Sequence, residues 1–282
     1  MVVEPRDGVK TPQEDEVRTT SNPAFRNLPT SGGSGSYAGF GQPYEAQQYG
    51  GYQSAPPTTG ERPITIDDVV TKTAITLATT LATGFISAWL VLSGQAKPLT
   101  LMLPGLIIGL VVSLIIIFKR TPSAPLVLIY AAAEGVFLGA ITGVFEGMFK
   151  GIAWQAILGT FGVFIAMLIV YKTGAIRVTP RLTKWIIGAT VGAAVLMLGN
   201  LVLGLFGVNV GLRDGGTLAI VFSLVVIGIA AFNFLLDFEA ANEMIRSGVP
   251  AKWAWWAAFG LMTTLVWLYL EILRLLSYLQ RD

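Results

Sequence analysis

The sequence contains no cysteine and no histidine, and only 13% of its 282 residues are charged. Without cysteine it forms no disulfide and has no thiol nucleophile, and without histidine it lacks imidazole acid-base chemistry and the usual zinc ligands. The formal net charge is only +2, with no Lys/Arg tract, which argues against nucleic acid as a partner. Any chemistry must therefore rest on carboxylates, amines, hydroxyls or amides, and we expect no cofactor and no metal centre.

Apolar residues are abundant instead, at 53% of the chain. From Val69 onward, apolar runs near the roughly 20 residues needed to cross a bilayer recur between short connections that carry Gly, Pro and charges. We therefore predict an all-α bundle of about seven transmembrane helices over residues 65–282, in the cell membrane. The expected spans are 70–92, 99–118, 124–145, 151–171, 184–206, 217–237 and 253–279.

Residues 1–64 have a different composition and include the segment SGGSGSYAGFGQPYEAQQYGGYQSAPP. Such a Gly/Ser/Pro/Tyr-rich stretch holds too few aliphatic side chains to bury a core. We predict a disordered tail without an activity of its own.

The Lys and Arg residues indicate which side the tail occupies, because cytoplasmic connections carry an excess of them. The connections on the side of the N-terminus have about twice as many as those on the other side. The first group is Arg62, Lys72, Lys119, Arg120, Lys172, Arg177, Arg181, Lys184, Arg246 and Lys252, and the second is Lys97, Lys150, Arg213, Arg274 and Arg281. We predict a cytoplasmic N-terminus.

Glycines recur at four-residue spacing, which stacks them on one helix face and lets a neighbouring backbone approach closely. We interpret this spacing as tight helix packing rather than as the lining of a pore. The series are Gly135, Gly139, Gly143 and Gly147, with Gly105/Gly109 and Gly188/Gly192 elsewhere.

Three acidic residues fall inside predicted spans, where an ionisable group is costly and is usually functional. Glu134 lies mid-span without a basic neighbour in its helix, so it either fixes helix packing or takes part in ion or proton movement. Asp237 ends the sixth span, with Asn233 one turn earlier on the same face. Glu271 lies in the seventh span, where Arg274 can pair with it along the helix, so a simple salt bridge competes with a functional role.

The segments AEGVFLG, LLDFE and LYLEILRLL resemble the corresponding parts of the Bax inhibitor motif family of roughly seven-helix membrane proteins. The architecture is similar over residues 65–282. The tail, with SNPAFRNLP, resembles an actinobacterial-type branch of that family.

The resemblance implies six helices around the last one and a calcium-permeable leak controlled by a carboxylate pair on the last two helices. At the matching positions these carboxylates are Asp237 and Glu271, with Glu in place of the family's usual Asp. Two close carboxylates titrate as one unit, so opening would follow pH. An Arg that holds the sixth-helix acid in some relatives has no counterpart within the second span.

Whether the two carboxylates meet depends on where the last helix begins. If it runs straight from Trp253, Glu271 lies about 27 Å along it and cannot reach Asp237. If residues 251–258 lie along the membrane interface and the span begins near Phe259, the two can meet.

Two functions remain open at this point: a pH-sensitive cation leak channel, and a non-conducting regulator that binds another membrane protein such as a quality-control protease. The expected partners are lipid, calcium or another cation, and such a protein. We do not expect an enzyme, because the chain has neither a Gly-x-Gly-Asp run nor a phosphate-binding loop.

Overall fold

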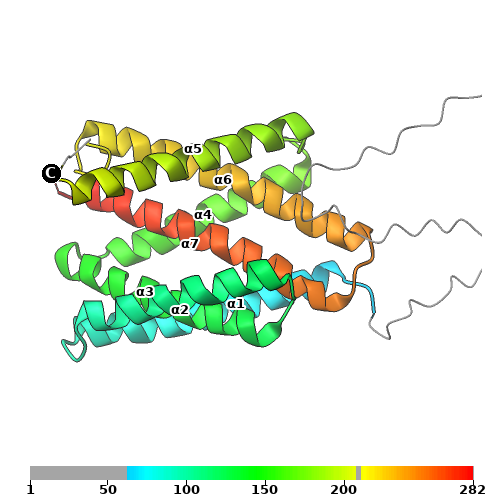
Figure 1. The fold of residues 1–282 in the computed structure, drawn as a ribbon, viewed down its shortest axis with the longest axis horizontal. Helices are drawn as coiled ribbons and strands as arrows, with labels where there is room; N and C mark the ends of the chain where they lie inside the picture. The colour runs from blue at the N-terminus through cyan, green and yellow to red at the C-terminus, as the bar shows by residue number, and fades with distance from the viewer. Residues whose placement is uncertain (1–61, 208–210, 282) are drawn as a thin grey trace, which may run out of the picture. The chain divides into compact units, whose positions relative to one another are not determined.

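The computed structural model describes residues 62–207 and 211–281. The predicted disorder of residues 1–61 lies outside the described residues and stays a prediction. In the described part, α-helices run back and forth with short connections (Figure 1). Their bounds are α1 Ile66–Leu92, α2 Pro98–Lys119, α3 Ala124–Met148, α4 Ile152–Thr173, α5 Pro180–Leu205, α6 Thr217–Arg246 and α7 Ala254–Leu279, with a short 3-10 helix, η1 (Ala251–Trp253), before α7.

All seven α-helices of the described residues are long and apolar enough to cross a membrane, which confirms the predicted fold class. Most ends agree with the predicted spans to within a few residues, but the predicted end of the sixth span at 237 is wrong. Helix α6 continues to Arg246 because Phe238 and Ala241 are buried and the Tyr171 hydroxyl donates to Glu239 Oε2 over 2.8 Å. Asp237 therefore lies about 13 Å inside the helix end.

Helices α1 and α3 approach each other through glycines. A Cβ added to Gly135 would collide with Thr80 and Thr83, and one added to Gly139 would lie only 2.8 Å from the Gly84 Cα. The predicted packing role is therefore confirmed for Gly135 and Gly139. Gly147 at the end of α3 has nothing within 4 Å of an added Cβ, and neither have Gly188 and Gly192 in α5, so there the same spacing is not used for packing within the chain.

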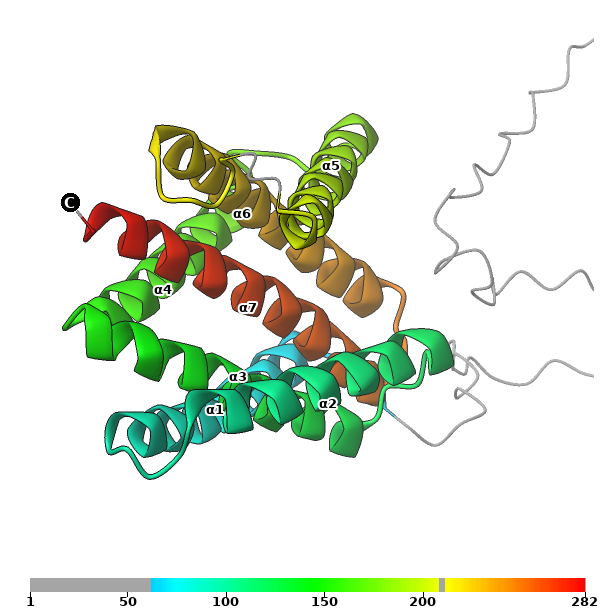
Figure 2. The same cartoon turned by 60° about the vertical axis from the view of Figure 1, so that its left-hand side comes forward.

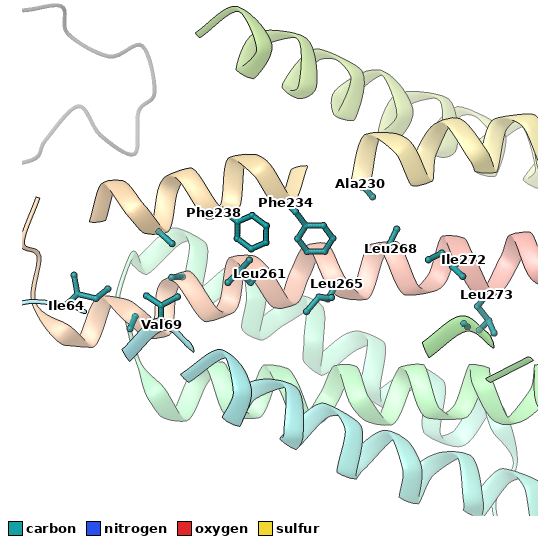
Figure 3. Packing of buried hydrophobic residues seen from close by; sticks show 14 of the residues in the cluster. Ile64, Val69, Ala230, Phe234, Phe238, Leu261, Leu265, Leu268, Ile272 and Leu273 are labelled. Atoms are coloured by element: carbon teal, nitrogen blue, oxygen red, sulfur yellow. The ribbon is translucent and has the colours of Figure 1, made fainter. Parts of the chain in front are cut away.

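Helix α7 is the most buried helix of the described residues and carries much of the core. Its Leu261, Leu265 and Leu268 pack beside Phe234 and Phe238 of α6 (Figure 3). It contacts α1, α3, α4 and α6, whereas α2 packs chiefly on α3 and α5 chiefly on α6 (Figure 2). The last helix is thus central, but the enclosure by six helices that the resemblance implies is incomplete.

The chain just before α1 is fastened to the connection between α6 and α7. The Ile64 N–H donates to the Val249 carbonyl and the Ala251 N–H donates to the Arg62 carbonyl, at 2.8 and 2.9 Å. Arg62 also forms two 2.7 Å hydrogen bonds to Asp68, whose carboxylate completes a capping box with Thr65 at the start of α1. Residues 62–64, which the sequence assigns to the tail, are therefore part of the helical unit.

We call the end of the bundle at which α1 begins the N-terminal end, and the end at which α7 finishes the C-terminal end. Exposed Trp side chains lie close to both ends, as expected at membrane interfaces. Trp185 lies near the start of α5, at the N-terminal end, and Trp89 and Trp154 lie at the C-terminal end.

The close approach of α1 and α3 predicts that Gly139→Ala destabilises the bundle by about 1–3 kcal/mol, because its methyl group overlaps the backbone of Gly84. Thermal unfolding in detergent micelles, followed by circular dichroism, measures the effect. Gly147→Ala in the same helix is the matched control and should leave the midpoint unchanged or raise it slightly. Equal midpoints for the two variants would contradict the packing role of Gly139.

Candidate functional site

Asp237 lies on α6 and faces α7. Its Oδ2 accepts a 2.6 Å hydrogen bond from the Thr264 hydroxyl. Thr264 is near the middle of α7, so Asp237 lies well inside the helix bundle, nine residues before α6 ends at Arg246. Within the described part of the chain no Lys or Arg pairs with this carboxylate. It is thus a carboxylate held by one hydroxyl among apolar helices.

Apolar side chains surround this level of α6. Phe234 and Leu235, three and two residues before Asp237, are fully buried, and Phe238 follows it. Phe164 of α4 packs edge-on against both Phe234 and Phe238, with ring centroids 5.3 and 5.7 Å apart. The aromatic cluster fixes the rotation of α6 and so keeps Asp237 turned toward α7.

Asn233 lies one turn before Asp237, as the sequence predicts, but it serves a different neighbour. Its Nδ2 donates to the Thr190 hydroxyl of α5 over 2.9 Å and to the Ile229 carbonyl over 2.8 Å. Asn233 therefore ties α5 to α6, and within the described residues it forms no hydrogen bond with Asp237.

Glu271 is almost fully buried in α7, with 2% of its surface exposed. Its Oε1 accepts a 2.6 Å hydrogen bond from Arg274, which confirms the predicted pair along the helix. A second guanidinium, from Arg213 in the connection between α5 and α6, lies 3.6 Å from the same oxygen. The other oxygen, Oε2, is buried without a hydrogen-bond partner. Two arginines thus share one carboxylate.

The structure does not bring Asp237 and Glu271 into contact. Asp237 is anchored at Thr264, and Glu271 lies about 10 Å farther along the axis of α7. Helix α7 is continuous from Ala254, and its first residues Ala254, Ala257 and Ala258 are buried in the bundle rather than spread along an interface. A proton shared directly between the two carboxylates would require this arrangement to change.

Glu134 is partly buried in α3 and lies against α2. Gly109 leaves room for its carboxyl group, since an added Cβ at that glycine would lie 3.0 Å from Glu134 Oε1. Within the described residues Glu134 has neither an ion pair nor a hydrogen bond through its side chain, so it lies at the contact between α2 and α3 without a polar partner.

A cavity of about 600 Å³ lies between α1, α3, α4 and α7. Its walls are mostly apolar, but the hydroxyls of Thr142 and Tyr269 form a 2.7 Å hydrogen bond there. Glu146 borders it and accepts hydrogen bonds from the N–H groups of Gly151 and Ala153 at the start of α4. Neither Asp237 nor Glu271 lines this cavity.

Sequence reasoning missed two residues of these sites. Thr264 is an ordinary polar residue within an apolar helix, and only the register of α6 against α7 gives it a role. Arg213 lies 58 positions before Glu271 in a Gly-rich connection, so no local pattern links the two. The only signal in the sequence was the presence of acidic residues inside apolar helices, because such residues need polar or charged partners that the sequence does not identify.

The sequence matches the model of a known protein family. The model of the family described as Bax inhibitor 1 like matches residues 16–281, nearly the whole chain. No curated protein matches the sequence.

The arrangement around Glu271 predicts that Arg274→Gln costs more stability than Glu271→Gln. Loss of Arg274 leaves a buried carboxylate with only the more distant Arg213, at a cost of about 3 kcal/mol. Loss of the carboxylate leaves two guanidiniums that are 26% and 30% exposed and can still reach water. Detergent-phase unfolding of both variants measures the difference.

A double variant, Glu271→Gln with Arg274→Gln, serves as the internal control. It should be more stable than Arg274→Gln alone, because no buried charge is left unpaired. A double variant less stable than either single variant would contradict the ion-pair interpretation.

Proposed function

The chain belongs to the Bax inhibitor 1 like family, and on that premise we propose that it is a pH-sensitive cation leak channel in which Asp237 is the proton-responsive group. Its apolar helices belong in a lipid bilayer. The excess of Lys and Arg at the N-terminal end supports a cell-membrane orientation with that end in the cytoplasm. Calcium is the cation that the family resemblance favours.

The observation that carries the proposal is the carboxylate of Asp237, held by Thr264 deep in the bundle without a cationic partner in the described residues. A charged group inside hydrocarbon is retained at a cost, which favours a functional role. The carboxylate and hydroxyl oxygens suit a hard cation, while so few ligands would bind calcium weakly. A cation that is bound weakly can leave the site again, which favours conduction of the cation over its retention.

Protonation supplies the link to pH. A proton on Asp237 removes the charge that attracts the cation, and the neutral carboxyl still hydrogen-bonds Thr264. We assign Glu271 a structural part: its ion pairs with two arginines hold the end of α7 to the connection before α6. Asn233 positions α5 against α6, and Glu134 is a further candidate along the ion path.

Calcium flux into liposomes at acidic and alkaline pH tests the proposal. Asp237→Asn imitates the protonated state, so its flux at every pH should equal that of the unmodified chain at acidic pH. Asp67→Asn, which changes an exposed acid at the start of α1, should retain the normal pH dependence. A flux that is independent of pH in the unmodified chain, or unaltered by Asp237→Asn, would sink the proposal.

A second candidate, a non-conducting regulator bound to another membrane protein, is favoured by the surface of α5. This helix packs chiefly on α6, and its Gly188 and Gly192 are free of neighbours within 4 Å of an added Cβ. Small residues allow another membrane helix to approach closely. Co-purification of one stoichiometric partner that is lost on Gly188→Leu, together with an absence of flux, would favour this candidate over the channel.

A further inference from the structure

One side of α7 is left open between Thr263 and Arg274. Because α2 packs chiefly on α3 and α5 chiefly on α6, neither covers this side, and α7 lies between the two groups (Figures 1 and 2). The residues concerned follow helical spacing and are exposed or partly exposed, whereas most of α7 is buried. We call them the open strip: Thr263, Trp267, Leu270 and Arg274.

A cavity of about 220 Å³ adjoins the open strip at the C-terminal end. Met102 of α2, Val144 of α3 and Leu270 of α7 contribute to its apolar wall, and Arg274 is its charged residue. At about 30 Å³ for a water-sized group, it holds about seven such groups, comparable to part of an acyl chain. An apolar space with one cation at its edge suits an amphiphile.

Among the described residues, the positive charge at this edge exceeds the negative charge that faces it. Arg213 and Arg274 both point at Glu271 Oε1, at 3.6 and 2.6 Å, so two guanidiniums meet one carboxylate. Both remain about a quarter to a third exposed. Burial, and then the charge of Arg274, lower the pKa of Arg213. The nearby Asp214 is directed to its own loop, where its Oδ1 accepts from the Gly216 N–H.

Arg213 and Arg274 lie at a depth suited to contact with a lipid headgroup. Arg274 lies about 8 Å before the end of α7, within reach of the interface for a long side chain. Trp89 and Trp154, both exposed, mark the interface at the same end. The phosphates of the adjoining leaflet therefore lie at the level of the guanidiniums.

We propose that this place binds an anionic phospholipid, with its phosphate on Arg213 and Arg274 and an acyl chain along the open strip and its cavity. Guanidinium groups bind phosphate oxygens in bidentate fashion, and the uncompensated positive charge favours an anionic lipid over a zwitterionic one. The apolar wall favours a lipid over a free anion. This inference does not depend on ion conduction.

The test uses the full chain in detergent micelles and compares phosphatidylglycerol with phosphatidylcholine of the same acyl chains. Native mass spectrometry should detect bound phosphatidylglycerol, with weaker binding of phosphatidylcholine and a loss of preference at high salt. Arg213→Gln, which leaves the Glu271–Arg274 bond intact, should weaken the binding of phosphatidylglycerol about fivefold. Arg181→Gln, an exposed change at the other end of the bundle, should have no effect.

Glu271→Gln separates lipid binding from a merely structural role. It frees both guanidiniums from their carboxylate, so it should strengthen the binding of phosphatidylglycerol by about fivefold even though it lowers stability. Three results would overturn the proposal. They are equal binding of phosphatidylglycerol and phosphatidylcholine, weaker binding of phosphatidylglycerol by Glu271→Gln, and a rise in the unfolding temperature with inorganic phosphate that equals the rise with phosphatidylglycerol.

Discussion

Hydrocarbon offers no hydrogen bonds, and this constraint governs the whole membrane unit. Backbone groups are satisfied inside the helices, and polar side chains must find partners there as well. Thr76 and Thr142 donate back to carbonyls of their own helix, and Ser87 donates across to the Val136 carbonyl of α3. Some hydroxyls are thus satisfied within their own helix, whereas others, such as Ser87 and the Thr142–Tyr269 pair, tie two helices together.

Close backbone approach adds the second kind of tie. Without Cβ atoms at Gly135 and Gly139, α3 lies so near α1 that the hydroxyl of Ser87 reaches a backbone carbonyl of its neighbour. The α1–α3 pair then provides one wall for α7, and α6 provides the other. Since α2 and α5 attach to the outside of these walls, one side of α7 stays open to lipid.

Much of this was predictable from sequence, because spans of about 20 apolar residues and breakers between them reflect the bilayer directly. The Glu271–Arg274 pair was predictable from its spacing along one helix. The position of Asp237 well before the end of α6 was not predictable, because the extension of α6 depends on a hydrogen bond from Tyr171 of another helix to Glu239. The role of Arg213 was not predictable either, since its contact with Glu271 joins residues far apart in the chain.

Asp237 of α6 and Glu271 of α7 are both acids inside apolar helices, where an ionisable group is costly, but they have different partners. Two arginines face the carboxylate of Glu271, and these ion pairs join the end of α7 to the connection before α6. Asp237 has one hydroxyl, which serves either a carboxylate or a carboxylic acid. The hydrogen bond from Asp237 to Thr264 can therefore hold α6 against α7 in either protonation state, whereas Glu271 is tied to two cations. The proposed function rests on this difference between the partners of the two acids.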